Sequence, residues 1–415
     1  MSVFNINLHE AIYSLSDALD LVGVTHIHHG KRVAYMAAEC GKHLGWHGPR
    51  LDDLFQAAIL HDCGVSKTAV HLRLAQFAWE LEGEHCTLGA ALLSSSPLLR
   101  HLAPVVRHHH THWSELKHLD LSDEEKHSAN CIYLVDRVDI LSLKYWLEGI
   151  DILLGKDEIR NTILDKRGDW FCPELVDAFM AISASEAFWF SLETNRVNGY
   201  VATWLADTTP QGMAFEELRG LVHLFSCIVD AKSHYTQQHS DGVASLARYI
   251  GTQFQLSEET CEMLELAGLL HDLGKLRVPD ELLEKPGKLT EAENLTMRHH
   301  SFDTYNILRN IKGFEKVALW AGQHHERVNG SGYPEHIKGE ALSLEARIIA
   351  VADVFQALAQ RRPYREPLAT PEIMDILKQQ VAAEKLDARV VALVEANLQA
   401  CWLAAMRVTA AQIKP

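Results

Sequence analysis

The chain has 415 residues, of which 47% are hydrophobic and 23% are charged, and its formal net charge is -16. This composition is typical of a globular protein with sizeable cores. The acidic balance argues against a nucleic-acid duplex or an anionic membrane as the main partner, and no apolar run approaches the ~18 residues that span a bilayer. The eight cysteines show no CxxC spacing, which argues against a disulfide framework or a thiolate zinc site. We therefore expect a cytoplasmic protein.

Apolar residues recur at helical spacing along most of the chain, and hairpin signals are nearly absent. Turn-forming residues gather first at 194–212, which predicts a boundary between two domains, 1–205 and 206–415. After this boundary, one predicted helix begins at His239 and carries on the same face Val243, Leu246, Ala247 and Ile250. Another leads through Leu266, Leu269 and Leu270 into His271. Loops are predicted at 277–290 and 329–334, and the expected fold class is all-α.

The two halves repeat a sparse pattern of histidine and aspartate. His29 and His61 are 32 residues apart, as are His239 and His271, and Asp follows each second histidine as Asp62 and Asp272. The 24-residue interval from His85 to His109 also recurs, from His300 to His324, and each interval ends in a His-His pair. Asp136 and Asp353 then lie at equivalent places. The sequence therefore predicts two tandem copies of one helical domain.

The histidines and aspartates of this pattern in the second copy supply nitrogen and oxygen ligands and no thiolate. This set suits iron, manganese, nickel or zinc better than calcium, and it is too large for one ion. It consists of His239, His271, Asp272, His300, His324, His325 and Asp353. A lone histidine on an apolar helix face is more often a core residue than a metal ligand. Asp353, however, lies in an apolar run, where burying a carboxylate without a partner would cost about several kcal/mol of folding free energy. We therefore interpret the set as a binuclear metal site, which clamps a phosphoryl group and activates a water.

Two longer motifs carry a resemblance to a known family. The segments His271-Asp272-Leu273-Gly274-Lys275 and His324 to Pro334, which ends in Gly332-Tyr333-Pro334, are similar to the signature of the HD-GYP branch of HD phosphohydrolases. The similarity runs from about 235 to 367. It implies two tandem HD-type helical domains and a bacterial phosphodiesterase that linearises a cyclic dinucleotide, either cyclic di-GMP or cyclic GMP-AMP. Tandem pairing resembles the enzymes that accept cyclic GMP-AMP.

The resemblance also implies roles for the individual residues. His239, His271, Asp272 and Asp353 would hold one divalent ion, and His300, His324 and His325 the other, with Asp272 shared; iron or manganese is favoured, with nickel, zinc or magnesium as alternatives. A metal-bridging hydroxide would attack phosphorus. Lys275 would offset developing charge, and the substrate would be bound by Lys275, Gly332, Tyr333, Pro334, Arg362 and Arg365.

Several positions depart from the family pattern. Asn329 and Gln356 stand where relatives often have Asp, which should cost little because neither is a metal ligand. Thr304 replaces a glycine, so we expect local helix packing to differ at that position. Some relatives gain a third metal through a glutamate one turn before the first histidine. Because Tyr235 occupies that position, we expect two metals.

The first copy keeps the metal-type residues and loses the cations that would meet phosphate. It retains His29, His61, Asp62, His85, His109, His110 and Asp136 as a candidate second metal site, although neighbouring His108 and His112 leave the assignment of the His pair open. Val65 stands in place of Lys275, and the positions of Arg362 and Arg365 hold Tyr145 and Glu148. We interpret this half as an HD-like domain that is regulatory or non-cleaving; the alternative is a second hydrolase acting on a phosphomonoester.

Two other functions of the whole chain stay open at this point. One is a different HD-type phosphohydrolase acting on nucleoside phosphates, against which Gly332-Tyr333-Pro334 and the two arginines argue. The other is a non-enzymatic receptor for the dinucleotide, against which the complete second ligand set argues. The expected partners are the cyclic dinucleotide and, within the chain, the other HD domain, with a homodimer as an open alternative.

Overall fold

The structure is a computed structural model that describes residues 2–22, 28–66, 83–206, 208–232, 239–360 and 366–407. Helices make up nearly all of its regular structure, so the expected all-α class is confirmed. The chain forms two compact units, one of residues 7–209 and one of residues 1–6 with 210–415. Among the described residues, no helix is both long enough and apolar enough to cross a bilayer.

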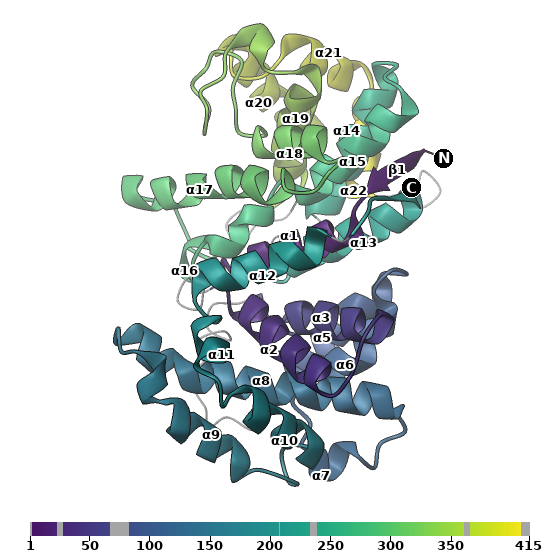
Figure 1. Ribbon diagram of the computed structural model, residues 1–415. Helices are drawn as coiled ribbons and strands as arrows, with labels where there is room; N and C mark the ends of the chain where they lie inside the picture. The colour runs from purple at the N-terminus through teal and green to yellow at the C-terminus, as the bar shows by residue number, and fades with distance from the viewer. Residues whose placement is uncertain are drawn as a thin grey trace. The chain divides into compact units, whose positions relative to one another are not determined.

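The unit of residues 7–209 is entirely helical within its described part (Figure 1). Its longest helix is α8, Asp123–Leu147, which a Ser122–Glu125 capping box starts and which packs against α2. The unit comprises α1 (Leu8–Leu19), α2 (His29–His43), α3 (Pro49–Leu60), α5 (Gly83–Ser95), η1 (Arg100–Leu102), α6 (Ala103–Arg107), α7 (Trp113–Leu116), α8, η2 (Ile152–Leu154), α9 (Lys156–Leu164), α10 (Pro173–Ile182), α11 (Glu186–Phe190) and α12 (Thr194–Ala206).

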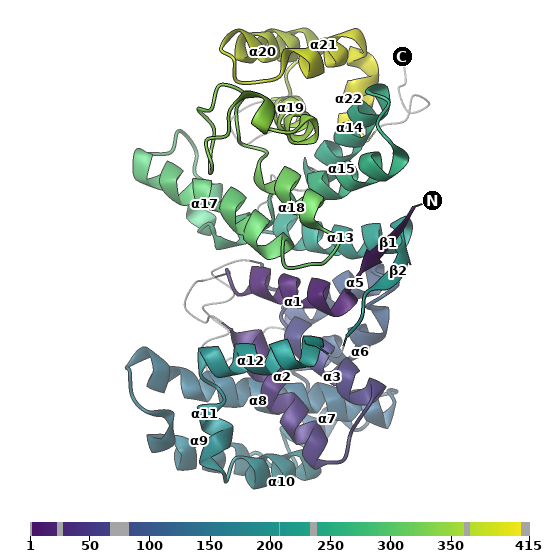
Figure 2. The same ribbon diagram turned by 45° about the horizontal axis from the view of Figure 1, so that its top comes forward.

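The second unit begins with a two-stranded sheet and continues as helices (Figure 2). Its centre is the packing of α14 on α15 and α19, whose inward faces are buried aliphatic residues. The unit comprises β1 (Val3–Ile6), β2 (Gln211–Ala214), α13 (Phe215–Asp230), α14 (His239–Gln253), α15 (Glu258–Leu270), η3 (Leu273–Arg277), α16 (Asp280–Leu283), α17 (Glu291–Leu308), α18 (Glu315–Gly322), η4 (Gly339–Ala341), α19 (Leu344–Ala359), α20 (Thr370–Ala382), α21 (Ala388–Ala396) and α22 (Leu398–Met406).

The division between the units differs in two ways from the simple sequence boundary. Residues 194–206 were expected to be turn-rich, but they form α12, because Val197 and Val201 are fully buried and outweigh the turn preference of the asparagines and glycine around them. The first strand also belongs with the second unit, since Val3 to Ile6 pair antiparallel with Ala214 to Gln211. Phe4 and Phe215 pack together beside this sheet, with their ring centroids 6.3 Å apart.

A buried ion pair joins α19 to the start of α21. Arg347 donates from Nη1 to Asp387 at 2.7 Å, and Asp387 also caps α21 through the backbone N–H groups of Arg389 and Val390. Burial would raise the pKa of Asp387, but the hydrogen bonds from Arg347 and Arg389 outweigh it and lower the pKa to about 2. The pair therefore stabilises the second unit while the carboxyl is ionised.

We expect Asp387→Asn to lower the free energy of unfolding of the second unit by about 3 kcal/mol, because Arg347 loses its buried partner. A carboxyl whose pKa falls on folding stabilises above its unfolded pKa, and this contribution is lost as the pH falls from about 4 to about 2. Urea unfolding at several pH values measures both effects. A difference between wild type and variant that is as large at pH 2 as at pH 7 would contradict the assignment.

Candidate functional site

The second unit brings seven predicted ligands together from five helices or the residues just after them. His239 begins α14, His271 and Asp272 follow α15, His300 lies in α17, and Asp353 lies in α19. His324 and His325 follow α18, which ends at Gly322. The set forms one cluster.

Asp272 lies at the centre of this cluster and faces two groups of imidazoles. Its Oδ2 lies 3.9 Å from Nε2 of His239 and 3.4 Å from Nε2 of His271. Its Oδ1 lies 3.7 Å from Nε2 of His300 and 3.9 Å from Nε2 of His324. Each carboxylate oxygen thus belongs to a different ligand group, which is the arrangement a bridging carboxylate needs.

Asp353 closes the cluster on the other side. Its Oδ1 lies 3.3 Å from Nε2 of His239 and 3.9 Å from Nε2 of His271, and its Oδ2 lies 4.0 Å from Nδ1 of His325. Burial would raise the pKa of Asp353, but His239, His271 and His325 outweigh it and hold the pKa well below the usual range. The carboxylate is therefore ionised and available as a ligand at neutral pH.

The tautomers of the histidines fit a metal rather than a hydrogen-bond network. His271, His300 and His324 each place Nδ1 2.6–2.8 Å from a backbone carbonyl three residues earlier, so Nδ1 carries the hydrogen and Nε2 a lone pair. Nε2 of His300 and Nε2 of His324 are nevertheless only 3.2 Å apart, and Nε2 of His271 is buried without a hydrogen-bond partner. Lone pairs facing one another need a cation between them, so the donor set fits divalent metal ions.

Burial acts to keep the imidazoles of His300, His324 and His325 neutral, whereas at His271 the charge of Asp272 outweighs burial and raises the pKa. Burial lowers the pKa of His300 to about 4, and with the neighbouring imidazoles it holds the pKa of His324 and of His325 well below the usual value. For Asp272 burial acts in the opposite direction, but the charges of His271 and Lys275 outweigh it and keep the pKa well below its usual value. At neutral pH His300, His324 and His325 thus present neutral nitrogens and Asp272 and Asp353 present ionised carboxylates, which are the ligand forms that metals bind.

Three polar contacts that the sequence did not predict hold these ligands in place. Nδ1 of His239 contacts Oε1 of Gln356, which fixes the ring orientation. Oγ1 of Thr304 accepts from the backbone N–H of Gly274 at 2.9 Å and donates to the carbonyl of His271 at 3.1 Å. The two family departures at Gln356 and Thr304 therefore support the metal ligands directly, although Gln356 lies 117 residues from His239.

The loop with Gly332, Tyr333 and Pro334 lies against His325. The centroid of the Tyr333 ring is 4.9 Å from that of the His325 ring. The guanidinium of Arg298 lies over the Tyr333 ring, 5.2 Å from its centroid. A Cβ on Gly332 would lie 2.4–2.5 Å from backbone atoms of the 325–327 segment, so only glycine fits. Arg298 was not predicted as a site residue; its spacing from His300 carries no signal by itself.

The structure describes the position of Lys275 but not the positions of the two predicted arginines. Nζ of Lys275 lies 2.5 Å from Oδ2 of Asp272, at the edge of the cluster, with 19% of its side chain exposed. Arg362 and Arg365 lie outside the described residues, as does Tyr235, on which the expected number of metals depends. Their places relative to the cluster are therefore still predictions.

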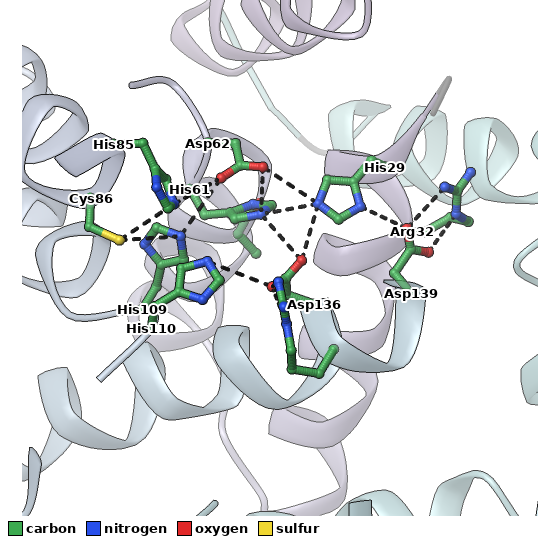
Figure 3. A network of polar contacts seen from close by, with 12 residues as sticks. His29, Arg32, His61, Asp62, His85, Cys86, His109, His110, Asp136 and Asp139 are labelled. Atoms are coloured by element: carbon green, nitrogen blue, oxygen red, sulfur yellow. Dashed lines mark hydrogen bonds and ion pairs between the residues drawn. The ribbon is translucent and has the colours of Figure 1, made fainter. Parts of the chain in front are cut away.

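The first unit contains a second cluster built on the same plan (Figure 3). Asp62 again faces two groups: its Oδ2 lies 3.7 Å from His29 and 3.5 Å from His61, and its Oδ1 lies 3.6 Å from His85 and 3.8 Å from His109. His110 and Asp136 complete the cluster, with Nε2 and Oδ2 3.8 Å apart. His108 contacts Thr111 and His112 stacks on Trp170, so His109 and His110 are the pair that faces inward.

The surroundings of the two clusters differ at the first histidine. Nδ1 of His29 lies 2.7 Å from Oδ2 of Asp139, and Asp139 also accepts hydrogen bonds from Arg32. In the second unit Gln356 stands at the position of Asp139, and Gly242 stands at the position of Arg32. Burial would lower the pKa of His29, but hydrogen bonds to Asp136 and Asp139 outweigh it and raise the pKa to about 10. Burial instead lowers the pKa of His239. The first histidines of the two clusters therefore differ in their electrostatic surroundings.

These features define a class: two helical units, each with the order His, His-Asp, His, His-His, Asp arranged around a shared aspartate. A family model described as an HD domain matches residues 223–390, and another HD domain model matches residues 27–141. The chain is 38% identical over 411 residues to the 3'3'-cGAMP-specific phosphodiesterase 1 of Vibrio cholerae, covering 95% of this chain and 93% of the relative. The chain belongs to this family of HD-domain phosphodiesterases, and the expected resemblance is confirmed.

Two further relatives match different lengths of the chain. The cyclic di-GMP phosphodiesterase response regulator RpfG of Xanthomonas campestris is 47% identical over 133 residues, which is 32% of this chain and 35% of that protein. The crystal structure of a cyclic GMP-AMP specific phosphodiesterase of V. cholerae, V-cGAP3, has a TM-score of 0.63 at 25% identity and covers 95% of this chain and 98% of that chain. The tandem arrangement is thus shared with a solved structure over nearly the whole length.

Proposed function

We propose that the chain hydrolyses one phosphodiester bond of 3'3'-cyclic GMP-AMP to give the linear dinucleotide, and that the second unit carries out the reaction. The observation that supports this most is Asp272, whose two oxygens face two separate groups of imidazole nitrogens. The preference for cyclic GMP-AMP is supported by similarity over the whole tandem chain to a relative named for that substrate, whereas the relative named for cyclic di-GMP matches 133 residues.

In this proposal the ligands of the second unit bind two divalent ions, with iron or manganese as the first choice. His239, His271, Asp272 and Asp353 would hold one ion, and Asp272 with His300, His324 and His325 the other. When bound, the ions would supply a water activated for attack and would offset negative charge on the phosphate. The hydrogen bonds from Nδ1 to backbone carbonyls would keep His271, His300 and His324 oriented with Nε2 toward the ions.

The remaining residues would bind and orient the substrate. Lys275 places an ammonium at the edge of the cluster, where it would meet a phosphate oxygen and stabilise charge that develops during cleavage. Tyr333 offers an aromatic ring beside His325, and Arg298 adds a positive charge over that ring. Gly332 and Pro334 shape the loop, and Arg362 and Arg365 would contact a phosphate or a guanine edge.

The first unit is regulatory or non-cleaving in this proposal. Val65 stands where the second unit has Lys275, and the segment matching Gly332 to Pro334 reads Lys117-His118-Leu119. It would act on the second unit by contact, within one chain or in a homodimer. We place the reaction in the cytoplasm, because all eight cysteines are free thiols and reduced thiols are typical of that compartment.

A turnover assay that offers 3'3'-cyclic GMP-AMP and cyclic di-GMP side by side tests the proposal. Protein stripped of metal by a chelator should be inactive, and Mn(II) or Fe(II) should restore cleavage of cyclic GMP-AMP to the linear product. A higher kcat/KM for cyclic di-GMP would overturn the substrate assignment. Binding of the dinucleotide without cleavage, in protein with two metals per second unit, would support a receptor instead.

Glu326 provides a test of the loop that is separate from the metals. Its carboxylate is buried and accepts from the backbone N–H groups of Glu335 at 2.6 Å and Ile337 at 3.1 Å, so it holds the loop that carries Tyr333. In Glu326→Gln one amide NH2 would face a backbone N–H, which costs about 1–3 kcal/mol. We expect KM to rise about tenfold with a smaller change in kcat and with unchanged metal content.

Steady-state kinetics with metal analysis separates this result from its alternatives. Loss of metal in Glu326→Gln would show that the loop supports the ligands rather than the substrate. Glu335→Gln is the matched control, because its carboxylate takes no part in these two hydrogen bonds, and it should behave as wild type.

A further inference from the structure

The cluster of the first unit contains a thiol for which neither the family pattern nor the repeat provides a role. Sγ of Cys86 lies 3.5 Å from Nε2 of His85 and 3.9 Å from Nε2 of His109. Ligand atoms of Cys86, His85, His109 and His110 all lie within 4.8 Å of one another. Cys86 is 2% exposed, and Figure 3 shows its sulfur pointing toward the imidazoles.

The second unit has a serine at the matching position. Ser301 follows His300 as Cys86 follows His85, and its Oγ lies 3.3 Å from Nε2 of His300. The shared aspartate and the histidines are otherwise equivalent in the two clusters. The exchange of serine for cysteine therefore changes the chemical character of one end of the cluster: a neutral hydroxyl is a poor metal ligand, whereas a thiolate is a strong one.

Two imidazole nitrogens face this thiol. Nε2 of His85 and Nε2 of His109 both lie within 3.9 Å of Sγ. Nδ1 of His109 lies 2.6 Å from the carbonyl oxygen of Val106, so Nε2 is the ring nitrogen that faces the cluster. Sulfur and nitrogen bound to one tetrahedral Zn²⁺ at its usual bond lengths are about 3.5 Å apart. The observed separations are close to that value.

We propose that the first unit binds a thiophilic divalent ion such as Zn²⁺ through Cys86 together with His85, His109 and His110. On binding, the Cys86 thiol loses its proton to solvent and a sulfur–metal bond forms, without any oxidation or reduction. The three imidazoles and the thiolate make a closed four-ligand set of the kind found in structural zinc sites. The two units then differ in metal chemistry, since the second cluster offers nitrogen and oxygen at the matching places.

Cobalt spectroscopy of the full chain tests this assignment without reference to turnover. Protein is stripped of metal and titrated with Co(II), and absorption in the near ultraviolet reports thiolate-to-cobalt charge transfer. We expect this band in the wild-type protein. In Cys86→Ser we expect the band to be lost and the amount of bound cobalt to fall. Cys63→Ser is the matched control, because Cys63 lies beside Asp62 but its Sγ contacts the carbonyl of Gly89; it should keep the band.

The opposite substitution, a cysteine in place of the serine of the second unit, should add a charge-transfer band. Ser301→Cys places a thiol 3.3 Å or slightly more from His300 and should add a second charge-transfer band of similar intensity. A band that survives Cys86→Ser would overturn the proposal and would point to Cys172, which lies beside His127, or to Cys227, which lies beside His223. Absence of the band from wild type with cobalt bound would overturn it as well. If Cys86→Ser does not fold, as judged by circular dichroism, Cys86→Ala provides the same comparison.

Discussion

We expect Asp272→Ala to lower kcat by about 10⁴-fold, the size of effect seen when a member of a tightly coupled catalytic set is removed. The reason is that Asp272 lies between the two groups of histidines, with Oδ2 facing His239 and His271 and Oδ1 facing His300 and His324. Without it, neither proposed ion keeps its full ligand set, and the mutual repulsion of the two ions is no longer screened. Turnover and metal content should therefore fall together in this variant.

The matched variant is Asp62→Ala, which makes the same change at the same place in the first unit. Its carboxylate has equivalent distances to His61 and His85, so the loss of local contacts is comparable. We expect it to retain turnover within about threefold, because the first unit lacks a counterpart of Lys275. A folded Asp62→Ala protein without turnover would contradict the assignment of cleavage to the second unit.

The second large effect is expected for Gly274→Ala, although Gly274 is not a ligand. A Cβ at this position would lie 2.1 Å from the carbonyl oxygen of His300, which is impossible without moving η3 away from α17. Such a shift of even about 1 Å misplaces catalytic groups and costs about 100-fold in rate. We expect kcat to fall by at least that factor and the metal affinity of the second unit to fall with it.

Gly64 provides the corresponding change in the first unit, where a Cβ would lie 2.1 Å from the carbonyl oxygen of His85. Gly64→Ala should leave cleavage largely intact while it removes the cobalt–thiolate band assigned to Cys86. Metal analysis and kinetics on both variants check the pair. Equal loss of turnover in the two variants, with both folded, would show that the units depend on each other for catalysis.

Sequence spacing predicted which residues would meet, because the intervals between the ligand-type residues repeat between the halves. It did not predict the contacts that hold them. Gln356 supports His239 across 117 residues, and Asp139 supports His29 across 110. Such pairs depend on the packing of helices that are distant in sequence, and one sequence contains no signal for them.

Two other features depended on tertiary packing for the same reason. The turn-prone residues of 194–206 become helical because Val197 and Val201 are buried against the rest of the first unit. The strand Val3–Ile6 is four residues long and its partner is far along the chain, so no hairpin signal marks it. The spacing of the cysteines also contained no signal for the metal site that we propose at Cys86.

The pairing of β1 with β2 has a consequence for synthesis on the ribosome. Ile6 pairs with Gln211, so the first strand leaves the exit tunnel about 200 residues before its partner and has none during that interval. At typical elongation rates this takes about 10–40 s, long enough for the intervening helical unit to fold first. The nascent chain thus carries an unpaired apolar strand, with Phe4 and Ile6, until the second unit begins to appear. A pause in translation inside the first unit would prolong this exposure and favour pairing with another nascent chain.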